Sequence, residues 1–399
     1  MAAPDNPLRV LFAAPAYWPA TAFGGPIPVL RSLATGLAGS GHAVDVVTTS
    51  LTTAHGPRSR RTRTELQEGS TIRYLATPVS YRWMGVTPTL PLWLERLPRP
   101  DVAHIFGFRD PVGTIVATWC LARGIPYVFE ALGMFRPKLR KVGLKRALDA
   151  SVYHHVPARA ARLLACSAIE RDEYVAGGVE RSRIALRPNG FPAVTTAPPG
   201  ALRARLALPS GTPLVVAVGR VADGKGLDLL VRSVPDLPGA HLAIVGPDDG
   251  HGTAVQLTRL MGGLGVAERV HLVGQLADDD VQGAYADADV VALASAHENF
   301  GMVAAEAAAA GRAILLTDRC GVAELLGGRG ALVVPYEGAA ISEGLRRLLA
   351  DGPLRARLGQ GARETARIWS WQTVVDLQTS VYEDILGARA RAGAAAGSA

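Results

Sequence analysis

The chain has 399 residues, of which 48% are hydrophobic, and its net charge is +7. That length favours two domains, because a single core seldom grows beyond about 250–300 residues, and the apolar content excludes a wholly disordered chain. No apolar run approaches the ~18 residues of a membrane-spanning helix, and three widely spaced cysteines, Cys120, Cys166 and Cys320, indicate reduced thiols rather than disulfides or a zinc site.

The first half of the chain alternates strand and helix patterns. Residues 8–14 form a buried-strand pattern that lacks a basic leader and is followed by Pro15 and Pro19, so it predicts a first strand rather than a signal peptide. A helix is expected at residues 29–38. Further strands are expected at residues 42–48, 71–76, 101–106, 126–130 and 162–167. This alternation predicts a parallel sheet covered by helices on both faces.

Several polar or glycine positions follow these strands. Gly24 and Gly25 lie between the first strand and its helix, where backbone amides can approach a phosphate, although an ordinary flexible loop fits equally well. His104 and Glu130 lie near the C-terminal ends of two strands, the edge at which open α/β sheets bind ligands. Each is a candidate catalytic residue, with a hydrogen-bonded core residue as the alternative.

Basic residues are concentrated in the first half, where residues 1–190 hold 24 Lys and Arg against 13 Asp and Glu. The segment 136–146 is rich in Arg and Lys and is interleaved with apolar residues, and a second cluster comprises Arg58, Arg60, Arg61 and Arg63. The first pattern fits either a basic amphipathic helix on an anionic membrane or a solvated basic face. No nucleic-acid recognition module is visible. The expected location is cytoplasmic, with peripheral contact at the inner face of the membrane as an option.

A proline- and glycine-rich linker at residues 193–200 predicts the domain boundary. The N-terminal Rossmann-like domain is expected at 1–194 and the C-terminal one at 205–370, with a cleft between them that could hold a ligand. Strands of the second domain are predicted at residues 213–219, 241–246, 270–274, 289–295, 313–317 and 331–334. An amphipathic helix at 371–386 is expected to cross back onto the first domain, and 387–399 to be a disordered tail.

The acidic run Asp278, Asp279 and Asp280 suggests metal binding at first sight, but it also fits the first turn of a helix. Asp287 and Asp289 resemble turn residues before a strand. No metal site is therefore predicted.

The stretch from His297 to Glu306 follows a predicted buried strand and leads into an alanine-rich helix. Glu298 is expected on the loop and Glu306 on the helix. The amides of Phe300, Gly301, Met302 and Val303 would then form a free helix N-terminus, which is a favourable position for an anion. The alternative is a solvated glutamate beside an ordinary strand–helix turn.

Two cations lie after the first strand of the second domain. Gly219 and Arg220 end this strand, and Lys225 with Gly226 opens the next helix, where both cations could neutralise a diphosphate. Gly-Arg-x4-Lys-Gly about eighty residues before Glu-x7-Glu resembles the family 4 glycosyltransferases of group 1. These are retaining enzymes of the GT-B fold, an α/β fold with two doubly wound parallel-sheet domains facing across a cleft.

The resemblance implies a role for each matching residue. Arg220 and Lys225 would hold the diphosphate of a nucleotide-sugar, Glu298 the transferred sugar and Glu306 the ribose. The other implied donor-binding residues are Gly24, Gly25, Gly219, Gly274, Gln275, Leu276, Phe300, Gly301, Met302 and Val303. The implied reaction transfers a hexosyl group, with a UDP-sugar favoured over a GDP-sugar, to an unidentified hydroxyl acceptor, without a metal ion or another cofactor.

The chain departs from the family pattern at three places. Phe106 stands where many relatives have a second histidine, Glu130 to Gly133 lacks a histidine common there, and Phe191 replaces a frequent acidic residue. The acceptor side is therefore less defined than the donor side. A nucleotide-sugar-binding protein without turnover, and a phosphorylase or epimerase of the same fold, remain alternatives.

Overall fold

The computed structural model describes residues 6–53, 58–81, 83–136, 153–194 and 197–397. The chain divides into two compact units: unit 1 comprises Met1–Pro188 and Trp371–Ala399, and unit 2 comprises Asn189–Ser370. The division between Pro188 and Asn189 therefore falls a little before the predicted linker.

Unit 1 is built on one eight-stranded sheet of strand order β10-β9-β8-β7-β1-β2-β4-β3. Its strands are β1 (Arg9–Ala14), β2 (Ala43–Thr49), β3 (Arg63–Gln67), β4 (Ser70–Leu75), β7 (Val102–Phe106), β8 (Tyr127–Glu130), β9 (Arg162–Ala165) and β10 (Ile184–Leu186), and a separate hairpin is formed by β5 (Val79–Tyr81) and β6 (Met84–Val86). Neighbouring strands of the large sheet run parallel except β3, which pairs antiparallel with β4. β1 lies at the centre because its apolar side chains are buried on both faces.

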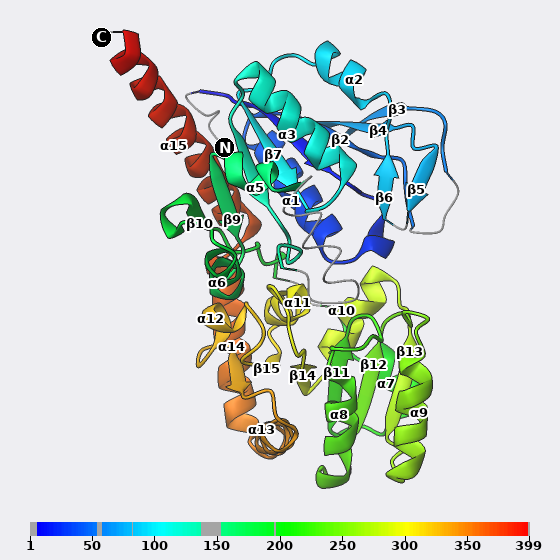
Figure 1. The fold of residues 1–399 in the computed structure, drawn as a ribbon. Helices are drawn as coiled ribbons and strands as arrows, with labels where there is room; N and C mark the ends of the chain where they lie inside the picture. Colours follow the sequence, from blue (N-terminus) through cyan, green and yellow to red (C-terminus); the bar gives the residue numbers. More distant parts are fainter. Residues whose placement is uncertain (1–5, 54–57, 82, 137–152, 195–196, 398–399) are drawn as a thin grey trace. The chain divides into compact units, whose positions relative to one another are not determined.

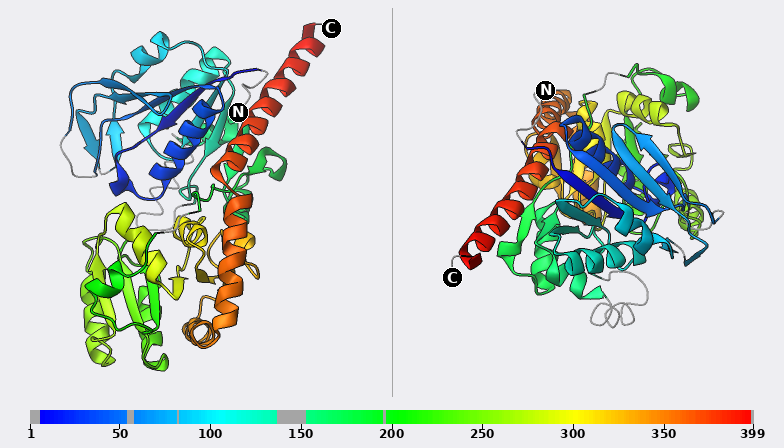
Figure 2. Two further views of the ribbon diagram at one scale, coloured as in Figure 1. Left: turned by 180° about the vertical axis from the view of Figure 1, so that it is seen from behind. Right: turned by 90° about the horizontal axis from the view of Figure 1, so that it is seen from above.

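Helices cover both faces of this sheet, as predicted from the alternating pattern (Figures 1 and 2). They are α1 (Pro26–Gly39), α2 (Leu90–Arg96), α3 (Pro111–Arg123), α5 (His155–Arg159), α6 (Ala168–Ala176) and α15 (Trp371–Gly397), with short 3-10 helices at Thr21–Phe23 and Arg181–Arg183. α15 runs alongside α1 (Figure 2), where a Cβ added to Gly36 would lie 2.4 Å from Val375 Cγ2. Glycine therefore permits the close approach of the two helices.

Unit 1 differs from the sequence prediction in a longer C-terminal helix and in the strands β3, β5, β6 and β10, which were not predicted. α15 continues to Gly397, so the prediction that the helix ends at residue 386 and gives way to a disordered tail is wrong as far as 397. The segment after Gly387 is rich in Ala and Arg, which are strong helix formers, and each glycine within the helix costs only about 1 kcal/mol. β3 was missed because its exposed, largely polar residues lack the apolar pattern of a core strand.

Unit 2 contains a six-stranded parallel sheet of order β13-β12-β11-β14-β15-β16. The strands are β11 (Leu214–Val218), β12 (His241–Val245), β13 (Val270–Gly274), β14 (Val290–Leu293), β15 (Ala313–Thr317) and β16 (Ala331–Val334). All six lie within the predicted strand positions. The order reverses between β11 and β14, as in doubly wound nucleotide-binding folds.

The helices of unit 2 are α7 (Ala201–Arg205), α8 (Leu227–Ser233), α9 (Thr253–Gly263), α10 (Asp278–Asp287), α11 (Met302–Ala309), α12 (Ala323–Leu326), α13 (Gly338–Ala350) and α14 (Gly352–Ile368), with a 3-10 turn at Val234–Asp236. α8, α9 and α13 pack on one face of the sheet around a core that includes Val215, Leu242 and Leu315. α10 packs against β11 and α11 against β14 and β15. The small alanines of α11 are buried, which lets this helix lie close to the strands.

Candidate functional site

The strand order of unit 2 brings two loops together. β11 and β14 are neighbours, but β11 leads toward β12 on one side and β14 toward β15 on the other. The loops after these strands therefore diverge and leave a crevice at the carboxyl edge of the sheet, where doubly wound folds bind ligands. Lys225 lies on the first loop and Glu298 on the second.

Lys225 and Glu298 form an ion pair between these loops. Lys225 Nζ donates to Glu298 Oε2 at 2.5 Å, and the two side chains are 29% and 24% exposed. Among the residues that the structure describes, no donor is bonded to the other carboxylate oxygen, Oε1, so it remains available as an acceptor. The structure thus places together two predicted site residues that lie 73 positions apart in the sequence.

The loops are also joined through their backbones. The amide of Ala296 donates to the carbonyl of Gly224 at 2.9 Å. Gly226 has a φ of +64°, and a Cβ there would lie 1.9 Å from the carbonyl oxygen of Ala294. Only glycine fits this left-handed position at so short a distance. The glycine after Lys225 therefore lets the lysine loop lie directly against the end of β14.

Arg220 is not part of this ion pair. It follows Gly219 at the end of β11 and is exposed, and no side-chain bond to another described residue involves it. Gly219 has a φ of +136°, and its carbonyl oxygen would lie 2.0 Å from a Cβ on Gly246. The ends of β11 and β12 thus approach closely and leave Arg220 as an exposed cation at this edge.

The N-terminus of α11 begins beside Glu298. Gly301 has a φ of +107° and precedes the first helical residue, Met302, and no side chain caps this end of the helix. Phe300 is buried, whereas Met302 and Val303 are partly exposed. The first amides of a helix have no intrahelical acceptor, so this end favours an anion. The predicted anion position at the start of α11 is thus only four residues after Glu298 in the sequence.

Glu306 lies one turn further along α11 and is partly exposed. Its Oε2 accepts a hydrogen bond of 2.7 Å from the hydroxyl of Tyr285, a fully buried residue of α10. Burial raises the pKa of Glu306; the hydrogen bond from Tyr285 opposes this shift, and the charge of Asp278 adds to it. Tyr285 was not among the site residues predicted from the sequence.

The loop after β13 carries three further predicted donor-binding residues. Gly274 ends β13 with a φ of +81°, its carbonyl accepts from the amide of Gly246 at 2.8 Å, and both Gly274 and Gln275 are exposed. Leu276 is partly exposed and is followed closely by α10. This loop therefore offers accessible backbone at the same edge of the sheet as Lys225.

The acidic residues nearby have structural roles. α10 begins at Asp278, so the three aspartates occupy its first turn, in agreement with the helix-start interpretation. Asp287 accepts bonds from the amides of Leu202 at 2.8 Å and Arg203 at 3.0 Å, and Asp289 accepts from the amide of Leu214 at 2.9 Å. Asp287 thus caps α7, a role that its position before a strand did not predict. Within the described ranges, no group of three His, Cys, Asp or Glu side chains could hold a metal ion.

In unit 1, Gly24 and Gly25 lie between β1 and α1, beside the point where the order of that sheet reverses. Gly24 has a φ of +90°, and a Cβ built on either glycine would have no neighbour within 4 Å. Neither glycine is therefore required by local packing. Their role in binding a diphosphate stays a prediction.

His104 lies on the predicted strand and fits the alternative of a hydrogen-bonded core residue. It is fully buried in the middle of β7; its Nδ1 lies 2.8 Å from the hydroxyl of Tyr382 on α15, and its Nε2 lies 3.3 Å from Glu130 Oε2. Glu130 also pairs with the buried guanidinium of Arg187. Burial lowers the pKa of His104 although Glu130 opposes the shift. A side chain enclosed in this way is out of reach of a substrate, which argues against the predicted catalytic role and indicates a structural one.

The same network explains Glu130 and Arg187. Burial alone would raise the pKa of Glu130, but the neighbouring charge of Arg187 and the hydrogen bond with His104 keep it below its usual value. The network joins β7, β8, the segment after β10 and α15. Arg187 was not among the residues singled out from the sequence.

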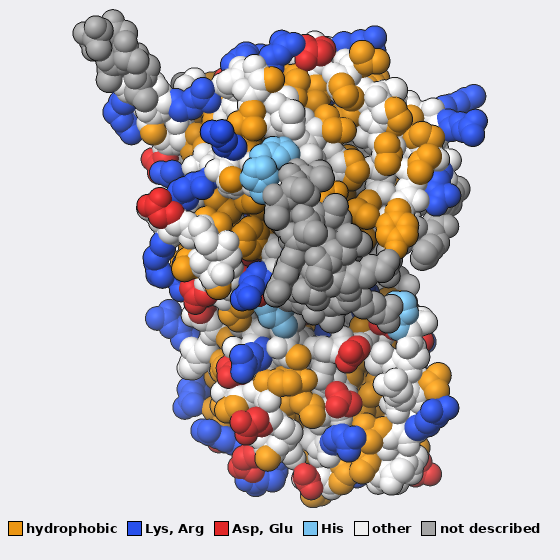
Figure 3. Space-filling view, in the orientation of Figure 1, with side chains coloured by type: hydrophobic (Ala, Val, Ile, Leu, Met, Phe, Trp, Pro, Cys, Tyr) orange, Lys and Arg blue, Asp and Glu red, His pale blue; other side chains and the backbone are white. Residues whose placement is uncertain are grey.

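The basic surface of unit 1 is described only in part. The predicted amphipathic segment 136–146 lies outside the described residues except for Arg136. Arg58, Arg60, Arg61 and Arg63 are exposed. On the face shown in Figure 3, most acidic side chains lie on unit 2. Among the helices of the described part of the chain, not one combines the length and apolar character that crossing a bilayer requires.

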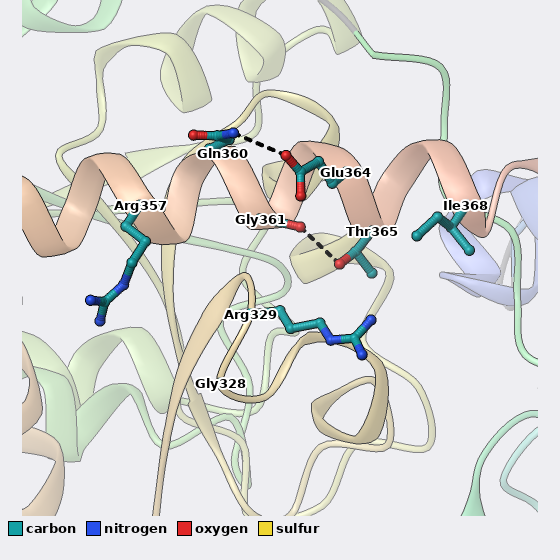
Figure 4. A pocket seen from close by; sticks show the side chains of 8 residues that line it. All are labelled: Gly328, Arg329, Arg357, Gln360, Gly361, Glu364, Thr365 and Ile368. Carbon is teal, nitrogen blue, oxygen red and sulfur yellow. Dashed lines mark hydrogen bonds between the residues drawn. The ribbon is translucent and has the colours of Figure 1, made fainter.

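A separate hollow of about 430 Å³ lies beside α14 and the loop at Gly328 and Arg329 (Figure 4). It contains none of the predicted site residues. Arg329 and Arg357 extend in different directions there, and Gln360 donates to Glu364 at 3.0 Å (Figure 4). Because the two cations do not converge, we assign no ligand to this hollow.

Comparison with known families matches both halves of the chain. Residues 24–190 match the glycosyl transferase 4-like domain, and residues 200–365 match the glycosyl transferases group 1 family. The chain therefore belongs to the group 1 glycosyltransferases of family 4.

Two curated relatives illustrate the similarity. The D-inositol 3-phosphate glycosyltransferase of Xylanimonas cellulosilytica is 36% identical over 224 residues, which are 51% of this chain and 52% of the relative. That of Nocardia farcinica is 33% identical over 276 residues, covering 65% and 59% of the two chains. The matches span only about half the length of these relatives.

Solved structures show the same architecture over nearly the whole chain. Sucrose-phosphate synthase from Thermosynechococcus elongatus superposes with a TM-score of 0.72 at 22% identity, covering 96% of this chain and 100% of that one. Anabaena HepE in complex with UDP gives a TM-score of 0.73 at 17% identity, with 94% and 100% covered. The fold is therefore GT-B with two Rossmann-like domains, as predicted. The predicted cleft between these domains stays a prediction.

Proposed function

We propose that this protein transfers a hexosyl group from a nucleotide diphosphate sugar to a hydroxyl acceptor, with retention of anomeric configuration. The observation that carries the proposal is the Lys225–Glu298 pair at the point where the sheet order of unit 2 reverses, followed directly by the uncapped start of α11. A cation, an acid and free amides at one sheet edge fit a sugar linked to a diphosphate. The products would serve polysaccharide, glycolipid or natural-product synthesis.

The proposed donor position follows the geometry of unit 2. Lys225 and the exposed Arg220 would neutralise the diphosphate, together with the amides from Phe300 to Val303. Glu298 Oε1 would accept from hydroxyls of the transferred sugar, and Glu306 from those of the ribose. The base would lie against the loop from Gly274 to Leu276, and Gly24 and Gly25 of unit 1 would complete the diphosphate site.

The bond between the anomeric carbon and the phosphate oxygen breaks in this reaction, and negative charge builds on the leaving phosphate. Lys225, Arg220 and the helix amides would stabilise that charge without a metal ion. A double displacement needs a carboxylate as nucleophile on the opposite face of the sugar. Because the sequence identifies no such residue, we favour attack from the same face as the leaving group, with the leaving phosphate accepting the proton of the acceptor hydroxyl.

A UDP-sugar is the favoured donor, with a GDP-sugar as the other option. HepE, which has the same fold, has been solved with UDP and with UDP-glucose. The D-inositol 3-phosphate glycosyltransferases suggest that a phosphorylated polyol should be included among the acceptors to be tested. Peripheral contact between basic unit 1 and an anionic membrane is a further proposal, which sedimentation with anionic and neutral vesicles tests.

The decisive assay incubates the protein with UDP- and GDP-sugars and measures nucleotide release with and without a panel of hydroxyl acceptors. Release that depends on an acceptor, with an α-linked product from an α-linked donor, supports the proposal. Binding without release indicates a nucleotide-sugar-binding protein, and release that depends on inorganic phosphate indicates a phosphorylase. Inversion of the anomeric configuration would refute the retaining mechanism.

A further inference from the structure

The carboxylate of Glu306 has a single side-chain donor. The hydroxyl of Tyr285 lies 2.7 Å from Oε2, and within the described part of the chain no second side chain bonds to either oxygen of this carboxylate. The neighbours of Glu306 along α11 are alanines, which end at Cβ and offer no hydrogen bond. Without Tyr285, the rotatable bonds of the glutamate would therefore be much less restricted.

Tyr285 itself is held firmly. It is 0% exposed, and Ala284 and Ala286 beside it are also buried. The last residue of its helix, Asp287, accepts from two amides at the start of α7. The hydroxyl of Tyr285 is thus presented to a partly exposed carboxylate from a rigid element.

We propose that Tyr285 is a positioning residue: its hydroxyl holds the carboxylate of Glu306 toward the two hydroxyls of a ribose, and so makes unit 2 select ribonucleoside over deoxyribonucleoside diphosphates. This inference rests on the proposed function, in which Glu306 binds the ribose. Each carboxylate oxygen has more than one acceptor site, so Oε2 can accept from Tyr285 and from a ligand hydroxyl together.

The protonation of the pair supports this role. Burial raises the pKa of Tyr285 well above its usual value, so the hydroxyl keeps its proton and donates. The hydrogen bond opposes the upward shift that burial gives to the pKa of Glu306. Tyr285 therefore also favours the ionised, accepting form of the glutamate. A hydrogen bond from a hydroxyl to a charged group is stronger than one between neutral groups.

The test measures the affinities of UDP and 2′,3′-dideoxy-UDP by titration calorimetry for the wild-type protein and for Tyr285→Phe. The wild-type protein should prefer UDP by about tenfold or more, the range expected when hydrogen bonds to a charged group are lost. In Tyr285→Phe, the affinity for UDP should fall while the affinity for the dideoxy compound changes little. The ratio of the two affinities should therefore fall to about threefold or less. A merely structural effect would weaken both ligands alike.

Two comparisons make the test specific. Tyr174→Phe removes another buried hydroxyl, one that donates to the carbonyl of Leu164 in unit 1, and should leave the ratio unchanged. Glu306→Gln should reduce the ratio, and the double variant Tyr285→Phe/Glu306→Gln should show little further loss because both act on the same ligand hydroxyls.

An unchanged ratio in a folded Tyr285→Phe variant that still binds UDP would overturn the inference. If thermal melting shows that Tyr285→Phe does not fold, wild-type discrimination in Glu306→Gln would overturn it instead. If UDP does not bind the wild-type protein, GDP and dideoxy-GDP are compared in the same way. Failure of both nucleotides to bind would overturn the proposed donor site itself.

Discussion

Removal of Lys225 separates a catalytic role from a structural one. The ion pair with Glu298 is partly exposed, at 29% and 24%, so solvent screens it and it contributes about 1 kcal/mol or less to stability. For a unit of this size, a loss of 1 kcal/mol lowers Tm by about 2–4 °C. The melting temperature of Lys225→Ala should therefore change only slightly.

The expected effect on the rate is much larger. If Lys225 stabilises the charge that develops on the leaving phosphate, its removal should raise the barrier by about 3 kcal/mol, the usual effect of losing one such donor. Since about 1.4 kcal/mol is a factor of ten, kcat should fall by roughly a hundredfold. Initial rates of nucleotide release at saturating donor, with an acceptor found in the release screen, measure this fall.

Arg232→Ala is a suitable control because it removes an exposed cation at the far end of α8. It should leave both the rate and the melting temperature close to those of the wild-type protein. A folded Lys225→Ala variant with turnover within about twofold of wild type would refute the assignment of this residue. A loss of rate matched by an equal loss of folded protein would refute the separation of the two roles.

Three further predictions concern the packing around these sites. Gly226→Ala should abolish transfer or lower the free energy of unfolding by about 3 kcal/mol or more, because its Cβ would collide with a backbone carbonyl. Gly224 has a φ of +79° and no neighbour within 4 Å, so Gly224→Ala should lower the free energy of unfolding by only about 1–2 kcal/mol, as measured by denaturant titration. Arg187→Met leaves Glu130 charged and buried without its guanidinium partner and should lower the free energy of unfolding by about 3–5 kcal/mol. The pKa of His104 is lowered in the folded protein, so as pH falls below about 6.5 this histidine takes up a proton in the unfolded chain before it does so in the folded one. The free energy of unfolding should therefore decrease toward pH 5, with a limiting slope of about 1.4 kcal/mol per pH unit, and His104→Asn should reduce this slope.

Each of these predictions can fail in a specific way. Equal stability of the two glycine variants would show that the close approach at Gly226 is unimportant. An Arg187→Met variant as stable as wild type would mean that the buried charge finds another partner. A slope that is the same with and without His104 would assign the pH dependence to other groups.

The fold could be predicted from the sequence to a large extent because it follows from local patterns. Buried strands of parallel sheets are short apolar runs, so the strands of unit 2 were found close to their observed positions. Edge elements such as β3 have no such pattern, since solvent covers one side of them. The helix after residue 386 was missed because low sequence complexity was interpreted as disorder, although alanine and arginine favour a helix.

The candidate site could likewise be predicted from the sequence only in part. Glycine, charge and spacing around Lys225 and Glu298 were sufficient to propose that the two belong to one site, because these residues are close to strand ends that a doubly wound sheet brings to one edge. The sequence also determined which side chains could bind a diphosphate, since charge and hydrogen-bonding capacity belong to the residue itself.

Only the tertiary structure decided how each side chain is used. His104 lies within a strand and Glu298 follows one, and both were candidate site residues, yet His104 is fully buried against Tyr382 and Glu130, whereas Glu298 remains partly exposed beside Lys225. Tyr285 has no local sign of a role beyond the core. Burial and partnership depend on residues far away in the sequence, and no local pattern contains that information.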